Sequence, residues 1–354
     1  MSNFYRIFFI LLLSILTANI SLAKPVKWRI AEVWSKDTPM FSDAVKSMIK
    51  QVDLMTNGEF KIEIFSAQDH KNSLGVFDMV KDGEFEMGHS VSNWWIEKDV
   101  NTAFFSSVPM GMIANEKHAW FYHGGGMELM QKVYGKYGLL AFPGGNNGTE
   151  MGGWFNKEIK SIDDLQGLKV RVPGWGGEVY EAIGADVTML PPAELYPALR
   201  DGKLDALEFV GPSLDHGMKF HELAKYYYTG WHSPGSEVQF LINQKAYEKL
   251  PGNFKQILQS AMKVAAYDML PHANHLSAVN LDKILTDFPE IKIRSFPRSV
   301  FLEFHKAMEA KLNETAASGD DLTKEIIQSQ RDYLRISRQW TRFSDQAYLN
   351  NSLK

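Results

Sequence analysis

The chain has 354 residues, enough for about two domains with hydrophobic cores of their own. Its composition is 45% hydrophobic, 23% charged and 12% aromatic, which excludes an intrinsically disordered protein. The net charge of −4 comes without a basic block or an acidic tail, so no nucleic acid is expected as a partner. The absence of cysteine excludes a disulfide scaffold, a thiolate metal site, a cysteine nucleophile and a lipid-modified N-terminal cysteine.

The first 23 residues have the pattern of a secretory signal peptide. Arg6 precedes an apolar stretch over residues 7–16, which is too short to span a bilayer. The small residues Ser21 and Ala23 then indicate cleavage before Lys24. The alternative is an uncleaved N-terminal anchor, against which the short apolar stretch argues. Because an exported protein without cysteine is typical of the bacterial periplasm, we expect the chain to be periplasmic.

The chain that follows alternates between predicted strands and helices. A short strand is predicted over residues 28–31, followed by a helix with Ser42 as its cap and apolar residues at helical spacing. Residues 60–64 alternate between apolar and charged side chains, as in a strand with one buried face. This β-α-β order predicts a mixed or mostly parallel sheet covered by helices.

Two segments of the chain share one plan. Residues 77–87 and 196–206 each read as a helix that ends at Asp-Gly and is followed by an alternating strand. If each belongs to one of two similar lobes, residues 87–95 and 206–209 should face each other across a cleft, because open α/β sheets bind ligands beyond the carboxyl ends of their strands. Asp-Gly is a common helix stop, so coincidence is the alternative.

The second half of the chain predicts strands over residues 168–172 and 236–243, a helix over 177–183 and an extended stretch over 187–190. The helix predicted over 254–285 contains Pro271, which should end or kink it. The remaining predicted elements are a short strand over 291–293 and helices over 299–312 and 321–348.

These elements predict an α/β fold of two lobes with discontinuous domains, shared hinge strands and long C-terminal helices. The expected division is lobe I over 24–147 and about 237–270, lobe II over 148–236 and about 286–320, and a helical extension over 321–354.

Charged residues inside predicted strands are the strongest signal of a binding site. Arg171 lies between Val170 and Val172, and Glu208 lies in the apolar run 207–210. Each charge either reaches water at a sheet edge or points into a pocket. A buried guanidinium needs an anion, and a buried carboxylate needs a cation or strong donors. Together the two suggest a cleft with one positive and one negative contact for a ligand. A glycine-rich crossing nearby carries Glu150.

Catalytic motifs are incomplete. Residues 211–215 lack the closing glycine of a nucleophile elbow, and residues 174–179 miss the last glycine of a dinucleotide-binding loop. No Walker loop occurs, and no pair of histidines has the spacing and glutamate of a zinc protease.

Several segments resemble one family. Residues 165–174, Leu-Gln-Gly-Leu-Lys-Val-Arg-Val-Pro-Gly, closely resemble the arginine strand of TRAP transporter solute-binding proteins of the DctP type. Further segments resemble the subgroup of that family that captures α-keto and 2-hydroxy acids with a metal cation; they are residues 75–78, 86–89, 151–154, 207–212, 224–228 and 230–232. The motifs follow in order across about residues 28–250 and in outline to 330.

The resemblance implies a two-lobed periplasmic binding protein, not an enzyme, that closes on a small organic acid and delivers it to DctQ-like and DctM-like membrane subunits. Arg171 would clamp the ligand carboxylate in a bidentate pair. Glu208 and the main-chain carbonyl of Phe209 would bind the cation, sodium or a divalent ion such as calcium. Glu150 stands where the subgroup has a cation-contacting glutamine.

The resemblance further implies that Asn146 is a ligand-binding amide, that Trp94 or Trp95 closes the pocket, and that Trp34 covers it from lobe I. The chain also departs from the subgroup. Ser233 and Gln239 stand where acids are expected, so the identity and the presence of the cation stay open. A zwitterionic or sulfonate ligand such as taurine is therefore an alternative.

Other classes of protein remain as hypotheses. An exported hydrolase or lyase could use a metal held by Glu150, Glu208 and a histidine, because paired acids around a metal can activate water. In a purely structural periplasmic protein, Arg171 and Glu208 would simply pair with each other. The terminal helix over 321–348 would cap its own lobe or pack against a second copy, giving a homodimer.

Overall fold

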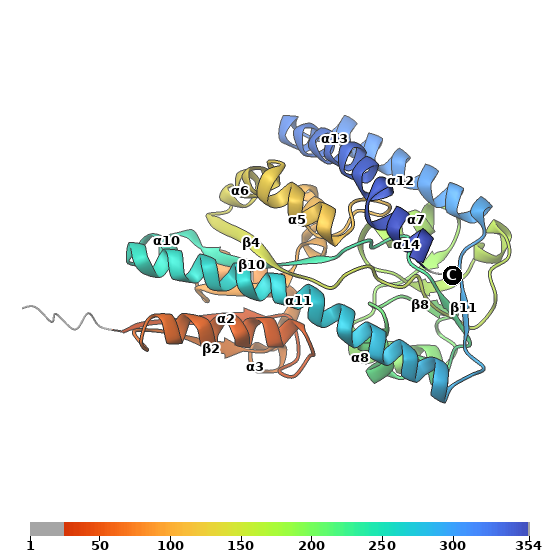
Figure 1. Ribbon diagram of the computed structural model, residues 1–354, viewed down its shortest axis with the longest axis horizontal. Helices are drawn as coiled ribbons and strands as arrows, with labels where there is room; N and C mark the ends of the chain where they lie inside the picture. Colours follow the sequence, from red (N-terminus) through yellow and green to blue (C-terminus); the bar gives the residue numbers. More distant parts are fainter. Residues whose placement is uncertain (1–24, 353–354) are drawn as a thin grey trace, which may run out of the picture.

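The computed structural model describes residues 25–352 (Figure 1). The predicted signal peptide, residues 1–23, lies outside the described residues. Within the described range, no helix combines the length and the apolar character that crossing a membrane requires.

A five-stranded mixed sheet forms the centre of the first lobe, in the order β2-β1-β3-β10-β4. β1 (Val26–Glu32) lies parallel to β2 (Phe60–Phe65) and β3 (Met87–Val91). β10 (Glu237–Asn243) runs antiparallel to β3 and to β4 (Leu139–Asn146). The parallel β1–β2 pair confirms the β-α-β order that the N-terminal sequence predicts. We call this part of the molecule lobe I.

Helices cover both faces of this sheet. On one face lies α2 (Phe41–Met55), which packs with the strands and with α11 in one hydrophobic cluster. The other helical segments of lobe I are α3 (Ala67–His70), η1 (Ser73–Gly75), α4 (Val76–Lys81), η2 (Ser92–Trp95), η3 (Val100–Phe105), α5 (Ala114–His123), α6 (Gly126–Gly135) and α10 (Gln244–Glu248).

Helix α2 corrects the predicted cap at Ser42. The helix begins at Phe41, and Met40 before it has a left-handed φ of 56°. The carboxylate of Asp43 accepts a hydrogen bond from the Met40 nitrogen at 3.0 Å, so Asp43 supports the helix start. The Ser42 hydroxyl instead donates to Glu32 Oε2 and to the Ser35 carbonyl, at 3.3 and 3.1 Å.

A six-stranded sheet forms the second lobe, lobe II, in the order β11-β9-β5-β8-β6-β7. Its strands are β5 (Gly153–Phe155), β6 (Lys169–Arg171), β7 (Asp186–Val187), β8 (Ala206–Leu207), β9 (Tyr226–Tyr228) and β11 (Lys292–Arg294). Its helical segments are η4 (Ile162–Leu165), α7 (Gly174–Ala182), α8 (Pro192–Arg200), α9 (Pro212–Met218) and η5 (Phe220–Glu222). β3 and β8, the strands that follow the two Asp-Gly stops, belong to different sheets.

Long helices join the two lobes. α11 (Gly252–Asp287) runs along both of them, packing on α2 and β4 of lobe I and on α9 of lobe II (Figure 1). The helix continues through Pro271, with Met269 and Ala273 on either side of it buried in the lobe I cluster and Asn280 donating to the Pro212 and Ser213 carbonyls of lobe II. α12 (Arg298–Ser318) packs on α7, and α13 (Asp321–Phe343) packs on α5 and α6 of lobe I.

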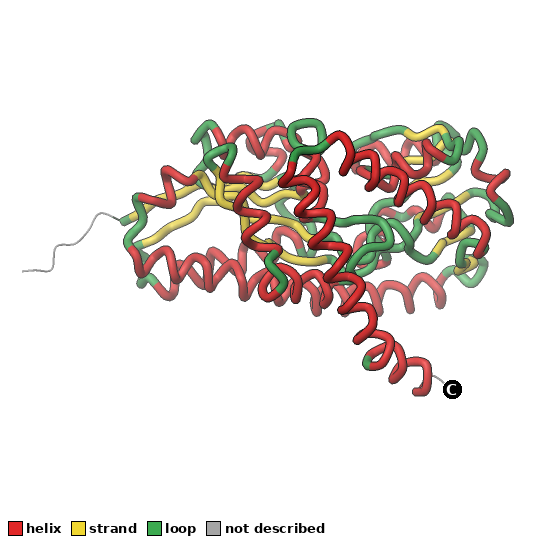
Figure 2. The backbone as a smooth tube through the Cα atoms, turned by 90° about the horizontal axis from the view of Figure 1, so that it is seen from above, coloured by secondary structure: helices red, strands yellow, loops and turns green. Residues whose placement is uncertain are grey.

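The terminal segment differs from the single helix predicted over 321–348. α13 ends at Phe343, and a separate helix, α14 (Asp345–Ser352), follows Ser344. Figure 2 shows this end of the chain leading away from the body of the molecule.

Candidate functional site

Three buried side chains from loops at the junction of the lobes form a cluster. Glu150 lies in the crossing between β4 and β5, Glu208 directly follows β8, and His232 lies between β9 and β10. One potential ligand atom of each residue lies within 4.8 Å of those of the other two. The fold thus brings together two acids that are 58 positions apart in the chain.

Arg171 completes this cluster with a fixed positive charge. It is the last residue of β6, and β6 pairs in parallel with β8, so Arg171 lies opposite Leu207 and next to Glu208. Its Nη1 donates to the Glu208 carbonyl at 2.7 Å and lies 3.7 Å from Glu208 Oε2, while its Nε donates to the Leu190 carbonyl at 3.3 Å. The guanidinium is 4% exposed and is therefore directed inward.

In the cluster, the acidic side chains of Glu150 and Glu208 lie beside the basic side chains of Arg171 and His232. His232 Nε2 lies 3.4 Å from Glu208 Oε1 and 3.6 Å from Glu150 Oε2. Burial by itself lowers the pKa of His232, but the two carboxylates outweigh burial and raise this pKa to about 9. Burial raises the pKa of Glu208 to about 7 even though His232 and Arg171 oppose the shift. Burial lowers the pKa of Arg171, yet a guanidinium stays charged.

Unpartnered atoms indicate that the cluster is built to hold a further group. Both carboxylate oxygens of Glu208, Nε2 of His232 and Oδ1 of Asn147 are buried without a hydrogen-bond partner among residues 25–352. Such atoms are rare in folded proteins and call for an ion, a water or a ligand. Carboxylate and amide oxygens are the ligands that hard cations such as calcium prefer. The residues present therefore fit a cation.

Three residues expected at the site make their contacts elsewhere. Asn146 is fully buried and donates to Glu237 Oε2 at 2.9 Å, while its Oδ1 accepts from the Gly148 nitrogen at 2.9 Å. The Gln239 amide bonds with Tyr134, Ser92 and the Phe105 carbonyl. Trp95 is 1% exposed and packs on Phe77 and Tyr134 in the lobe I core, which leaves Trp94 of the two tryptophans as a residue that can face a cleft.

The remaining expected residues are half-buried. Trp34 and Trp94 have ring centroids 6.0 Å apart. The Trp34 indole donates to His89 Nδ1 at 3.1 Å, so its orientation is fixed from lobe I. Phe209 packs against hydrophobic clusters from both lobes.

Sequence reasoning missed one member of the cluster, His232, and one residue that bonds with the cluster, Asn147. His232 falls in the Gly-Trp-His motif over residues 230–232, and that position is the available signal. Asn147 donates to Glu150 Oε1 at 2.5 Å and is 6% exposed. It follows the expected Asn146 by one position, and nothing in the sequence distinguishes the two amides.

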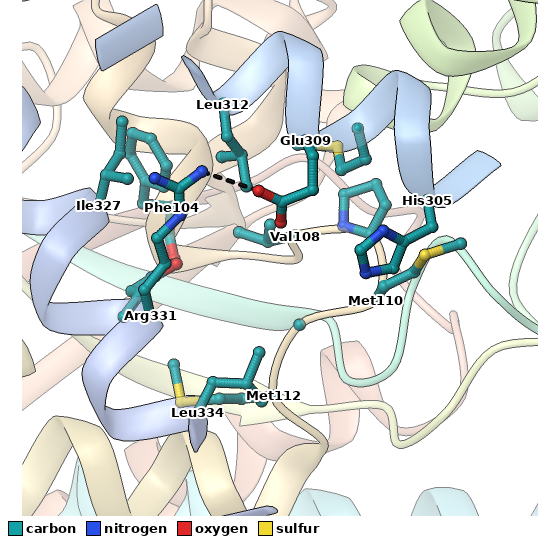
Figure 3. A pocket seen from close by; sticks show the side chains of 14 residues that line it. Phe104, Val108, Met110, Met112, His305, Glu309, Leu312, Ile327, Arg331 and Leu334 are labelled. Carbon is teal, nitrogen blue, oxygen red and sulfur yellow. Dashed lines mark hydrogen bonds and ion pairs between the residues drawn. The ribbon is translucent and has the colours of Figure 1, made fainter. Parts of the chain in front are cut away.

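A separate cavity of about 90 Å³ lies between the loop around Met110, α12 and α13 (Figure 3). Arg331 and Glu309 form an ion pair of 2.9 Å at its wall, and most other lining side chains are apolar. The cavity shares no lining residue with the cluster, so it is not part of the candidate site.

Comparisons with known proteins agree on one family. Residues 30–318 match the sequence profile of the DctP family, bacterial extracellular solute-binding protein family 7. A monocarboxylate 2-oxoacid-binding periplasmic protein of Nostoc sp. is 36% identical over 94% of this chain and 91% of its own length.

Two crystal structures of TRAP periplasmic solute-binding proteins are also similar. The protein from Colwellia psychrerythraea, with bound calcium and pyruvate, is 53% identical with a TM-score of 0.91, covering 93% of this chain and 100% of that one. The protein from Pseudoalteromonas atlantica, with bound sodium and pyruvate, is 51% identical with a TM-score of 0.89, covering 92% and 99%. The fold and the sequence lead to the same conclusion: the chain belongs to the DctP family of bacterial extracellular solute-binding proteins.

Proposed function

We propose that this protein is the periplasmic receptor of a TRAP transporter and that it captures a small 2-oxo or 2-hydroxy monocarboxylate together with a cation. The observation that carries the proposal is the inward-facing guanidinium of Arg171 beside two acids, one of which, Glu208, has two buried oxygens that accept no hydrogen bond in the described chain. The pyruvate found with calcium or sodium in the two similar crystal structures supports the same class of ligand.

Arg171 would bind the ligand carboxylate. Its Nε and Nη1 are held by the Leu190 and Glu208 carbonyls, so the guanidinium plane is fixed before the ligand arrives. Nη2 forms no hydrogen bond within residues 25–352 and stays available to the ligand. A preoriented planar donor group binds a carboxylate more tightly than a flexible ammonium does.

The cation would be held by Glu208, Glu150 and the main-chain carbonyl of Phe209. A carboxylate ligand placed beside Glu150 and Glu208 meets like charges, and a cation between them offsets that repulsion. Oxygen donors suit sodium and calcium, whereas an imidazole suits transition metals better, so His232 is not one of the proposed ligands.

Closure of the lobes would retain the ligand. Glu150 and His232 lie on segments that cross between the lobes, whereas Arg171 and Glu208 belong to lobe II. A ligand that touches both sets of residues favours the closed arrangement, because only differential contacts can shift such an equilibrium. We propose that the closed receptor docks on the DctQ-like and DctM-like membrane subunits and releases its ligand chemically unchanged.

Calorimetry with pyruvate tests the proposal directly. Arg171→Lys should weaken pyruvate binding at least tenfold, or by ~1.4 kcal/mol, because lysine cannot reproduce the planar fork. Arg200→Lys is the matched control, since the Arg200 side chain is 57% exposed and pairs with Asp201 on the surface of lobe II. Equal pyruvate affinity in Arg171→Lys and the unchanged protein would remove Arg171 from the site.

The alternative ligands are distinguished in a thermal-shift series. Pyruvate should raise the melting temperature in the presence of calcium or sodium and lose most of that effect with a chelator and a sodium-free buffer. Taurine should have no effect. A rise with taurine alone, independent of cation, would instead favour a zwitterionic ligand. Recovery of unaltered pyruvate after incubation with the protein would distinguish the receptor from a metal-dependent hydrolase or lyase.

We also propose that the C-terminal extension joins two copies of the receptor. Large apolar side chains of α13 and α14 are exposed, with Trp340 at 71%, Phe343 at 78% and Tyr348 at 73%. Adjacent exposed aromatic side chains are typical of a surface that another chain covers.

A further inference from the structure

Beneath the proposed cation site lies a buried carboxylate that the proposed function does not use. Asp215 is 1% exposed and lies in α9. Its Oδ2 accepts hydrogen bonds from Trp154 Nε1 at 3.0 Å and from the Tyr227 hydroxyl at 2.8 Å. Its Oδ1 accepts from the main-chain nitrogens of Val210 and Gly211 at 3.3 and 3.1 Å. Both oxygens are therefore saturated by the protein itself.

The first pair of donors ties Asp215 to the lobe II sheet. Trp154 lies on β5 and Tyr227 on the neighbouring β9, and their rings stack with centroids 3.9 Å apart. Because both rings are fully buried and stand on neighbouring strands, they give the carboxylate a fixed position relative to the sheet.

The second pair of donors fixes the segment that follows Glu208. A peptide unit is planar and trans, so its N–H and C=O point in opposite directions. The Val210 N–H is directed at Asp215, and the carbonyl of the same peptide, that of Phe209, must therefore point away from Asp215. In this way the hydrogen bond to Val210 sets the direction of the Phe209 oxygen.

The other carbonyls of this segment are already used. That of Glu208 accepts from Arg171 Nη1 at 2.7 Å, and that of Val210 accepts from the Met151 nitrogen at 2.9 Å. Within the described part of the chain, the Phe209 carbonyl accepts no hydrogen bond. An oxygen held in one direction and left without a donor is suited to a cation.

We propose that Asp215 is a positioning residue that aims the Phe209 carbonyl at the cation, so that it sets cation affinity without touching the cation or the organic acid. This inference rests on the proposed function. Groups that orient metal ligands in this way typically change affinity ten- to a hundredfold when they are replaced.

Asp215→Asn is the test variant, because asparagine keeps the shape but offers one acceptor oxygen in place of two. The calcium concentration for half-maximal pyruvate binding should rise at least tenfold. At saturating calcium, pyruvate affinity should return to within about threefold of the unchanged protein, since Arg171 is untouched. Arg171→Lys should show the opposite behaviour, with a loss of pyruvate affinity that calcium does not restore.

Asp205→Asn is the matched control. Asp205 also accepts a main-chain hydrogen bond in lobe II, from the Lys169 nitrogen at 3.0 Å, but it lies outside the segment after Glu208. Its replacement should leave the calcium requirement unchanged. If Asp215→Asn does not fold, Tyr227→Phe takes its place, because it removes one of the two donors to Oδ2; the calcium requirement should then rise two- to fivefold.

Two results would overturn the inference. One is a folded Asp215→Asn protein, or Tyr227→Phe in its place, with an unchanged calcium requirement. The other is a loss of pyruvate affinity that saturating calcium does not repair, which would mark a general structural role. Failure of the unchanged protein to bind calcium and pyruvate at all would instead contradict the proposed function.

Discussion

Glu32 is a buried carboxyl group outside the proposed binding site. It is fully buried at the end of β1, and its Oε1 has no hydrogen-bond partner within residues 25–352. Burial raises its pKa to about 7, against the opposing effect of the Ser42 hydroxyl. Because the folded protein binds this proton more tightly than the unfolded chain does, the associated stability is complete below pH 4.5 and is lost as the pH rises through about 7.

Glu32→Gln should remove this dependence, because an amide has no charge to bury. We expect the variant to be more stable than the unchanged protein at pH 8, by roughly 3 kcal/mol, and to match it near pH 4. Urea unfolding at both pH values measures the difference. Glu63→Gln, at an exposed position of β2, is the control. A constant difference between pH 4 and pH 8 would contradict the prediction.

At the scale of elements, the crossing between β4 and β5, which carries Glu150, packs directly against Gly230 in the segment after β9. A methyl group added at Gly230 would overlap the Glu150 carbonyl oxygen, and main-chain atoms cannot turn aside as a flexible side chain can. Gly230→Ala should therefore displace Glu150, weaken pyruvate binding severalfold and lower stability by about 1–3 kcal/mol.

Gly217→Ala provides the comparison for Gly230→Ala. A methyl group at Gly217 in α9 meets open space, and alanine favours a helix, so we expect a gain of about 0.5–1 kcal/mol with unchanged pyruvate affinity. Calorimetry and denaturant unfolding of both variants test the pair. Full pyruvate affinity in Gly230→Ala would contradict the packing argument.

The strands themselves could be predicted from the sequence, but the direction of their side chains could be predicted only where a single face is buried. β2 alternates between buried and exposed residues over Phe60–Glu63, and its sequence shows the same alternation. β10 is buried along its whole length, so its residues carry no sign of which face each side chain takes. The resemblance to the subgroup places Gln239 where an acid of the pocket is expected, whereas its side chain bonds with Tyr134, Ser92 and the Phe105 carbonyl of lobe I. The extended stretch expected over 187–190 is shorter in the structure, because the Leu190 carbonyl bonds with Arg171 instead of a strand.

The candidate site was predictable where its residues lie in predicted strands, and not where they lie in loops. A charge within an apolar strand is anomalous, and this anomaly distinguishes Arg171 and Glu208 in the amino-acid sequence alone. His232 and Asn147 lie in loops, where no periodicity distinguishes a buried side chain from an exposed one. Their place in the cluster depends on how the crossings fold together.

At the scale of the whole molecule, the proposed dimer makes a direct prediction. The exposed aromatic side chains of α13 and α14 should be covered in solution, and the mass measured by light scattering at micromolar concentration should be twice that of one chain. The double variant Trp340→Glu, Phe343→Glu should be monomeric, because charges are depleted at the core of such interfaces. Its pyruvate affinity should not change, since these residues lie on the terminal helices. A monomeric unchanged protein would contradict the prediction.

The continuity of α11 limits how the receptor can open. Because α11 packs on both lobes, a rotation about the crossing strands alone would break its contacts. A wide opening must therefore bend α11 or slide it over its neighbours. Pro271 has no N–H, so the helical hydrogen bond from residue 271 to the carbonyl of Tyr267 is absent. We therefore expect a wide opening to bend α11 near its middle, where this hydrogen bond is absent.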